Sequence, residues 1–457
     1  MPGAFRALGT LKYRIILEGI MVGLLVGIVI SLFRFALSQL DNIRNLMVGL
    51  SGPVEGVPSS GAAAGGGLGS LSGGLAGSDG LFGGALSPLA LIGLVILAVF
   101  AFLVSYFVYQ EPYISGSGIP QVKGELMGKI KTNWLRVLLL KFFGGIMAIS
   151  SGLALGREGP SIQLGAMVGK GFSRLSGRLK SEERLLISAG AGAGLAAAFG
   201  APLAGVVFVL EELRKDFDPK VLLSTMAAAV TSEYVASFVF GLEPVFSIFA
   251  FSKPTLNDYW MILILGVVLG FIGVLYNKLI AVSQDLQGRI RPRWLKALIA
   301  AVVIVAMAIF FPECLGSGHS LVEGAGFGLN TASTLAILLL VRFIYSIYSF
   351  GTGAPGGIFL PLLVLGGLAG GAFTGFVSPL VGLPAGNEAF YVILGMAGMF
   401  SAIVRAPITG IILISEMTGA LSNLLPLSLV SLISFLTAEA LGGEPIYDQL
   451  LERLLKK

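Results

Sequence analysis

Long apolar stretches follow one another along almost the whole chain, and they constrain its fold more than any other feature. A helix needs about 20 predominantly apolar residues to cross a bilayer. Charged residues make up only 12% of the 457 positions, where a soluble domain carries roughly 25%. The sequence therefore predicts an all-α polytopic membrane protein. Its apolar stretches include residues 15–40, 88–109, 137–155, 186–210, 221–240, 258–282, 297–311, 332–350, 388–404 and 424–441.

The composition also limits the chemistry that the chain can perform. A single cysteine, Cys314, excludes an intramolecular disulfide, and a single histidine, His319, argues against a metal cluster built by the protein. The formal net charge of +5 suits loops at anionic lipid headgroups or an anionic solute. We expect no cofactor, no metal and no nucleic-acid partner.

One segment, residues 51–88, is rich in glycine, serine and alanine. Such a composition does not order a backbone, so we expect a flexible loop between two spans. No soluble domain is visible in the sequence at either end. We therefore expect residues 1–457 to form one transmembrane transport domain.

The chain contains an internal repeat with a spacing of about 200 residues. Single matches are weak in a glycine-rich sequence, but several share nearly the same offset and fall in the same order. We infer two related halves. The matching segments are 116–118 with 316–318, 160–165 with 361–366, and 200–211 with 405–416.

Glycine and proline interrupt the apolar stretches at residues 116–120, 156–160 and 356–361. Proline suits the first turn of a helix, so each motif is predicted to open a helix inside the membrane. A helix start presents unpaired N–H groups and the positive end of the helix dipole, which attract an anion. Repeated halves with interrupted helices are typical of transporters that bind their solute near the midplane.

Glu158, within Gly156-Arg157-Glu158-Gly159-Pro160, is the strongest functional candidate. A carboxylate inside a bilayer costs about 2.5–3.5 kcal/mol on insertion scales, so such residues usually mark an ion or proton path. The structural alternative is a carboxylate paired with Arg157 at a membrane surface.

The three interrupted motifs, in this order, together with Lys141-Phe142-Phe143-Gly144, resemble the CLC family of chloride channels and chloride/proton antiporters. The resemblance runs from about residue 10 to about residue 450. It implies two inverted-topology repeats of tilted and broken helices, with halves at roughly 13–240 and 256–450. It also implies a homodimer with one ion pathway in each subunit.

The resemblance implies an anion-binding site made by four residues. Ser117 and Tyr447 would offer hydroxyl groups to a central chloride, and Ile358 and Phe359 would offer backbone N–H groups. The alternatives are that Ser117 only caps a helix and that Tyr447 is an interfacial tyrosine.

The resemblance also implies a proton route with two carboxylates. Glu158 would be the gating glutamate, which competes with chloride and moves away when protonated. Glu212 matches the internal proton-transfer glutamate of the family's exchangers, and its presence favours exchange over a passive channel. The alternative for Glu212 is the charged end of a span, because residues 211–216 are mostly charged.

The expected function is therefore the exchange of chloride for protons, with a passive voltage- or pH-gated chloride channel as the alternative. Fluoride and nitrate are competing substrates, against which Ser117 favours chloride within the family. An intramembrane hydrolase that uses a serine and His319 would need the two held at hydrogen-bond distance. No nucleotide-binding module is visible after the membrane part, which resembles the prokaryotic branch, so we expect the plasma (inner) membrane of a prokaryote.

Overall fold

The computed structural model describes residues 2–48, 88–246, 256, 259–381 and 387–456. Of the expected loop at 51–88, only Pro88 belongs to these described residues, where it begins a helix. Within the described ranges the chain is almost entirely helical. Its β-type pairing there consists of an isolated bridge between Gly156 and Gly357.

The elements fall into two series. The first series runs α1 (Pro2–Val48), α3 (Pro88–Gln110), η1 (Pro112–Ile114), α4 (Ile119–Leu126), α5 (Trp134–Ser150), α6 (Glu158–Leu175), α7 (Lys180–Phe199), α8 (Pro202–Phe208), η2 (Val209–Arg214) and α9 (Pro219–Phe240). The second runs α10 (Tyr259–Gly288), α11 (Arg293–Phe310), η4 (Pro312–Cys314), α12 (His319–Gly326), α13 (Ala332–Gly351), α14 (Phe359–Val381), α15 (Glu388–Val404), α16 (Pro407–Thr418), η5 (Leu421–Asn423) and α17 (Leu424–Ala440). The last helix is α18 (Ile446–Leu455).

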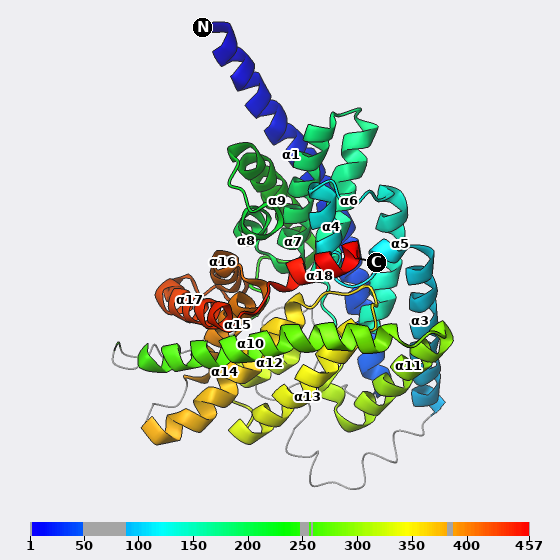
Figure 1. The fold of residues 1–457 in the computed structure, drawn as a ribbon, viewed down its shortest axis with the longest axis vertical. Coiled ribbons are helices and arrows are strands. Elements are labelled where there is room, and N and C mark those ends of the chain that lie inside the picture. The colour runs from blue at the N-terminus through cyan, green and yellow to red at the C-terminus, as the bar shows by residue number, and fades with distance from the viewer. Residues whose placement is uncertain (1, 49–87, 247–255, 257–258, 382–386, 457) are drawn as a thin grey trace.

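The two series repeat one another, as the sequence offset predicts. Each passes through a 3-10 turn, a short helix of eight residues and then longer helices in the same order. Most helices of the first series lie above most helices of the second series in Figure 1. The bridge that joins the two series is antiparallel, so the equivalent segments of the two series run in opposite directions where they meet. The prediction of two inverted halves of broken helices is confirmed.

Close helix crossings hold each half together. In the first half α6 packs on α7, and a Cβ placed on Gly165 would lie 3.1 Å from the Cα of Gly194. In the second half α14 packs on α15 through Gly366 and Gly395. Small residues at such crossings let helix backbones approach closely, which is how membrane helices associate without a hydrophobic driving force between them.

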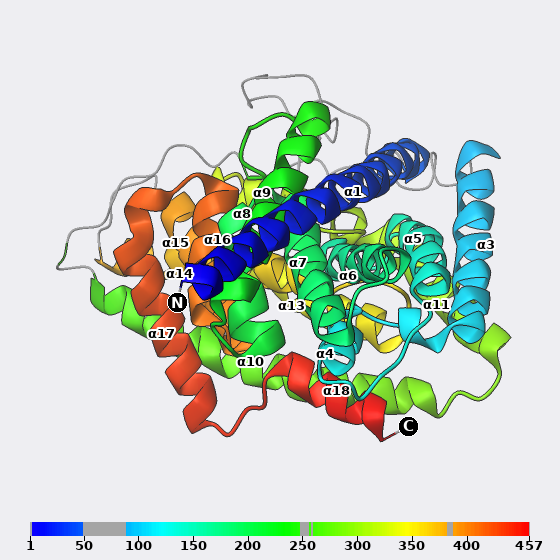
Figure 2. The ribbon, with the colours of Figure 1, turned by 90° about the horizontal axis from the view of Figure 1, so that it is seen from above.

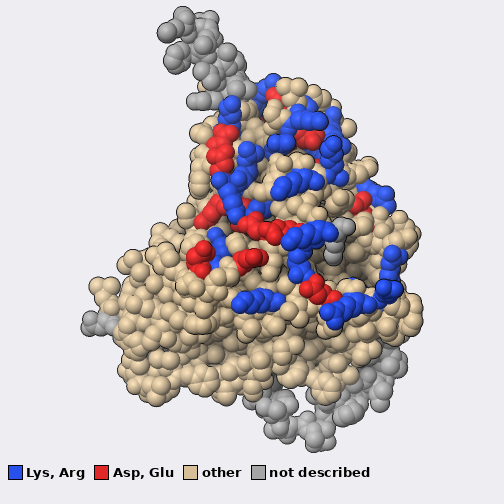
Figure 3. Space-filling model, in the orientation of Figure 1, with Lys and Arg blue, Asp and Glu red and all other residues tan. Residues whose placement is uncertain are grey.

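The surface is that of a multi-pass membrane protein. Among the described residues, six helices are long and apolar enough to span a bilayer. Charged side chains gather in the upper and middle parts of the face in Figure 3, and a broad uncharged area lies below them. Many large apolar side chains are exposed, such as Phe238 and Phe310. The expected polytopic membrane architecture is therefore confirmed. The six helices are Tyr13–Asn45, Pro219–Phe240, Tyr259–Gly288, Arg293–Phe310, Ala332–Gly351 and Phe359–Val381.

The crossing of α14 and α15 generates a prediction about stability. In Gly366→Ala the new Cβ would lie 2.8 Å from the Cβ of Met399 and would overlap the carbonyl of Gly395. We expect overpacking of this kind to cost about 1–3 kcal/mol, measured as a lower thermal unfolding midpoint in detergent. Gly288→Ala is the control, because a Cβ on Gly288 meets nothing within 4 Å. Equal unfolding midpoints for both variants would contradict the close packing of α14 on α15.

Candidate anion and proton pathway

The three glycine-rich loops meet at one place in the interior. The Gly156 and Gly357 backbones exchange two hydrogen bonds of 2.7 Å. Gly116 accepts a hydrogen bond from the Gly356 N–H at 3.1 Å, and a Cβ on Gly159 would come within 3.0 Å of both Ser117 and Gly357. The loops lead directly into α4, α6 and α14. The prediction that each motif opens a helix is confirmed, and the starts of these helices converge.

A buried cation supports this loop region in each half. The Lys141 ammonium, on α5, donates to the carbonyl oxygens of Ile114 at 2.8 Å and Gly116 at 2.7 Å. The Arg342 guanidinium, on α13, donates to the carbonyls of Cys314 and, at 2.6 Å, Gly316. Both cations are fully buried. Sequence reasoning noted Lys141 only within a family motif and missed Arg342, which the repeat offset of 201 from Lys141 could have revealed.

The predicted anion ligands from the loops lie together in the interior. Ile358 and Phe359 are fully buried at the start of α14. Within the described part of the chain, their N–H groups have no backbone acceptor. Ser117 is 2% exposed, and its hydroxyl oxygen accepts the Ile119 N–H at 3.3 Å. Ser117 therefore lies just before the N-cap of α4, Gly118, and still carries a hydroxyl hydrogen that it can donate to an anion.

Tyr447 reaches the same region from the other end of the chain. Helix α18 crosses back from the second half and packs beside α4, as Figures 1 and 2 show. Tyr447 on α18 is fully buried rather than interfacial. Its ring meets Phe208 edge-on at 6.5 Å, and Phe208 in turn meets Phe359 at 6.0 Å. Among the described residues, its hydroxyl has no hydrogen-bond partner.

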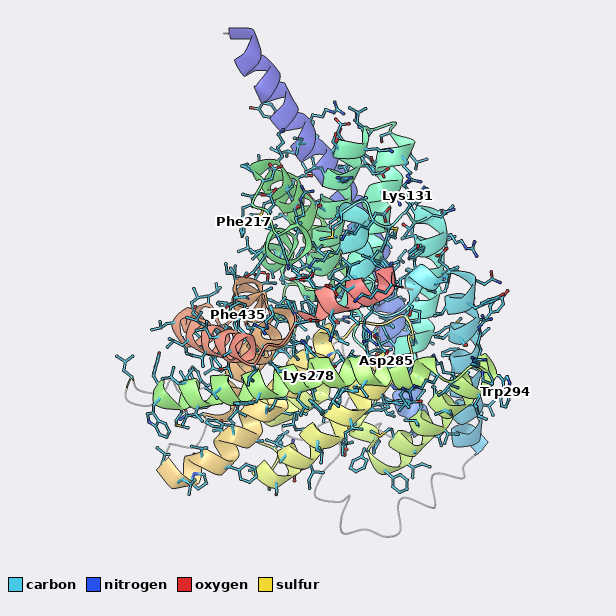
Figure 4. The ribbon with its side chains drawn as sticks, in the orientation of Figure 1. Lys131, Phe217, Lys278, Asp285, Trp294 and Phe435 are labelled. Atoms are coloured by element: carbon cyan, nitrogen blue, oxygen red, sulfur yellow. The ribbon has the colours of Figure 1, made fainter. Side chains whose placement is uncertain are left out.

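Ion pairs hold α18 in this position. The Arg453 guanidinium contacts Asp285 and donates to the Ala281 carbonyl at 3.2 Å. Figure 4 shows Asp285 on α10, beneath α18. At the other end of α18, Asp448 binds Lys123 at 2.5 Å and Lys215 at 2.7 Å. Partial burial tends to raise the pKa of Asp448, but the hydrogen bonds from the two lysines outweigh it and hold that pKa below its usual value.

Glu158 is fully buried at the first position of α6. Its carboxylate lies near the backbone N–H groups of Glu158 itself and Leu360. Among the described residues, however, none forms a hydrogen bond of full geometry with it. Arg157 approaches it only to 3.9 Å. Glu158 is therefore buried rather than at a surface, and Arg157 forms only a long ion pair with it. The carboxylate occupies the N-terminal ends of α6 and α14, where an anion is favoured.

Glu212 is 2% exposed and accepts a hydrogen bond of 2.7 Å from the Lys123 ammonium. It lies in η2, a π-helical turn, and such turns are frequent at functional sites. The neighbouring Glu211 points elsewhere and accepts from the N–H groups of Ile408 at 3.1 Å and Thr409 at 2.7 Å. Glu212 therefore lies in the charged turn that follows α8, but it is buried and paired there rather than exposed. Sequence reasoning missed Lys123. Its position three residues after Pro120, the last residue of an interrupted motif, was a usable signal.

The two candidate carboxylates share one aromatic neighbour. Tyr447 is close enough to both Glu212 and Glu158 to interact with them electrostatically. The repeat shows that this arrangement is confined to one half: at the offset of 205, Glu211 matches Glu416, but Glu212 matches Met417. Glu416 caps α8 at the Leu203 and Ala204 N–H groups, as Glu211 caps α16. Glu212 is thus an addition to the shared framework.

His319 does not form a hydrolytic pair. Its ring stacks on Phe246 at 4.4 Å, and its Nε2 faces Glu323 at 3.5 Å. Among the described residues, no serine hydrogen-bonds to it. The hydrolase alternative has no site here.

Comparison with known proteins agrees with this geometry. Residues 97–439 match the family described as voltage gated chloride channel. The chain is 39% identical over 385 residues to the H(+)/Cl(-) exchange transporter ClcA of Vibrio parahaemolyticus, covering 82% of each chain. It is 37% identical over 383 residues to the ClcA of Yersinia pestis, covering 81% of this chain and 79% of the relative.

Solved structures show the same fold. A slow cyanobacterial Cl-/H+ antiporter superposes with a TM-score of 0.85 at 30% identity, covering 97% of this chain and 98% of the antiporter. A CLC-type fluoride/proton antiporter superposes with a TM-score of 0.71 at 21% identity, covering 94% of this chain and 96% of the other. The interrupted motifs, the repeated helices and the relatives agree, and the chain belongs to the CLC family of chloride channels and transporters.

Proposed function

We propose that this protein exchanges chloride for protons across the membrane. The observation that carries the proposal is Glu212, a buried carboxylate paired with Lys123 in the half that also holds Glu158. A passive channel has no need of a second titratable group at such a position. Relatives named as H(+)/Cl(-) exchange transporters support the same interpretation.

Chloride binds where Ser117, Tyr447 and the N–H groups of Ile358 and Phe359 converge. Partly buried helix starts contribute up to about 2 kcal/mol each, and hydrogen bonds to a charged group about 1.5–3 kcal/mol each. These terms offset dehydration of a small anion. No full cation touches the chloride directly, since Lys141 binds backbone carbonyls. The chloride is therefore not held too tightly to be released.

Glu158 and chloride are alternative anions for the same N–H groups at the starts of α6 and α14. Protonation removes the charge of Glu158, so its side chain leaves and chloride takes its place. Glu212 exchanges protons with the solution near Lys123 and passes them toward Glu158. The coupling follows because chloride occupies the place of Glu158 only while Glu158 is protonated and has moved away.

The whole of 1–457 acts as one transport domain with halves at 13–240 and 256–450, and we propose that two chains associate with one pathway each. The support is an apolar face to which both halves contribute. Helices α8 and α16 pack together between α9 and α17, and Leu203 and Ile408 on them are 47% and 48% exposed.

The dimer proposal predicts that light scattering in mild detergent gives the mass of two chains. Ile408→Trp should give one chain, because the larger ring disturbs a surface that must fit its own copy. Val302→Trp is the control, since Val302 is 59% exposed on α11, away from this face. A wild-type mass of one chain, or equal behaviour of both variants, would refute the proposed face.

Lys141→Met should weaken chloride binding at least about tenfold. The variant removes two charge-assisted hydrogen bonds that hold the Ile114 and Gly116 carbonyls, each contributing about 1.5–3 kcal/mol. Isothermal titration of the solubilised protein with chloride measures the effect. Lys131→Met, at the exposed position labelled in Figure 4, is the control; unchanged affinity in Lys141→Met would show that the loop is held by other means.

Glu158→Gln should abolish coupled proton movement and leave passive chloride flux. The amide resembles a protonated carboxyl but releases no proton, so flux should also lose most of its pH dependence. Chloride- and pH-electrode recordings on the same liposomes make the measurement, with Glu452→Gln on exposed α18 surface as the control. A variant that still moves protons against their gradient removes Glu158 from the mechanism.

Glu212→Gln separates the exchanger from the channel. Glutamine keeps the size of the side chain and does not titrate, and Lys123 retains Asp448 as its ionic partner. We expect chloride transport to persist at a lower rate while proton coupling disappears. If the wild type moves no protons with chloride, the channel alternative is correct; if the variant keeps full coupling, protons take another route.

A further inference from the structure

A cavity of about 290 Å³, distinct from the proposed anion site, lies between α3, α5 and α11. Its walls are mostly apolar, with Val104 and Val108 on α3, Ala148 on α5, and Ala297 and Ala300 on α11. Figures 1 and 2 both show α3 and α11 side by side at the edge of the molecule. The cavity therefore opens between two peripheral membrane helices.

Two cations line this cavity on α11. Arg293 begins the helix and Lys296 follows one turn later. The Arg293 guanidinium lies over the Tyr109 ring at 3.6 Å, which fixes it beside the end of α3. The start of an 18-residue helix adds a positive dipole end at the same place. This part of the cavity attracts a negative group.

The hydroxyl groups of Ser151 and Thr352, which also line the cavity, need no polar ligand. The Ser151 hydroxyl donates to the Ala148 carbonyl at 2.7 Å, and the Thr352 hydroxyl donates to the Ser349 carbonyl at 2.7 Å. Both groups are satisfied within the protein, so an apolar chain can lie against them without leaving a polar group unpaired. The cavity thus combines a cationic mouth with an apolar interior.

We propose that this cavity binds an anionic membrane lipid, with its phosphate at Arg293 and Lys296 and one acyl chain between α3 and α11. The two helices face lipid, since Val99 on α3 and Val302 on α11 are 48% and 59% exposed. A free phosphate would gain the cations but would leave the apolar interior unfilled. Charge and shape together favour the lipid.

The lipid site adjoins the framework of the anion site. Its wall includes Gly353, whose carbonyl accepts hydrogen bonds from the Gly116 N–H at 3.3 Å and the Ser115 hydroxyl at 2.9 Å. An acyl chain at Thr352 and Gly353 therefore stabilises the loop that precedes Ser117. Occupancy is expected to raise the rate of chloride transport, a consequence that rests on the proposed function.

Native mass spectrometry of the delipidated full chain tests the binding without any transport assay. We expect the wild type to retain phosphatidylglycerol in preference to phosphatidylcholine. Removal of both cations in R293A/K296A should weaken this retention by roughly tenfold or more. The matched control is R289A/R291A, which removes two exposed cations from the segment before α11 that do not line the cavity.

A variant that fills the cavity provides an independent test of lipid binding. Ala300→Phe keeps both cations and occupies the interior, so it should also lose phosphatidylglycerol. Equal retention by the wild type and R293A/K296A overturns the proposal, as does equal loss in R289A/R291A, which would indicate general surface attraction. Displacement of the lipid by inorganic phosphate would mean a soluble-anion site and would also overturn it.

Chloride flux in vesicles tests the consequence. Adding phosphatidylglycerol to phosphatidylcholine vesicles should speed transport by the wild type and by R289A/R291A, and should leave R293A/K296A unchanged. The same acceleration in R293A/K296A would refute the link through Gly353. A wild type without chloride transport would instead refute the proposed function, and the binding result would stand by itself.

Discussion

The pair of backbone hydrogen bonds between Gly156 and Gly357 is the contact on which the rest of the pathway depends. It joins equivalent points of the two halves in antiparallel fashion, and it leads on each side into a helix, α6 and α14. Because the halves are inverted, the two helix starts face one another. Their unpaired N–H groups then create a place for a negative charge inside an apolar protein.

The charged groups buried around this contact need polar partners, and some of these groups have better partners than others. Lys141 and Arg342 are fully buried, and each donates to two backbone carbonyls. Lys123 binds two carboxylates, of Glu212 and Asp448. Glu158, among the described residues, lacks a hydrogen bond of full geometry. A buried charge with such weak partners is costly, which supports the proposal that Glu158 is protonated and moves.

The repeat provides a framework, and the departures from it provide the function. Glu211 and Glu416 cap each other's helices in a symmetric exchange. Glu212 has only Met417 as its counterpart, and Glu158 matches Phe359 at the offset of 201 that Gly156 and Gly357 share. The two candidate proton-carrying carboxylates thus belong to the first half. We propose that these two residues let a symmetric anion-binding scaffold carry protons as well.

The sequence by itself determined the class of fold, the repeat and the positions of the helix starts, while the inversion of the two halves was implied by the family resemblance. These depend on apolar length, on a common offset and on where glycine and proline stand, all of which are local or periodic properties. It also indicated Glu158 as a functional residue, because a lone carboxylate in an apolar segment is costly to bury. Residues 51–88, expected as a loop, lie outside the described residues except for Pro88.

Only the tertiary structure decided which distant groups meet. The return of α18 brings Tyr447 and Asp448 to α4, and nothing in the local sequence of 446–455 indicates that destination. The pairing of Lys123 with Glu212 joins residues separated by 89 positions. The burial of Arg342 and the cavity beside α11 likewise follow from helix packing. Periodicity specifies which face of a helix is apolar, but the choice of neighbour depends on packing and charge pairing across the whole molecule.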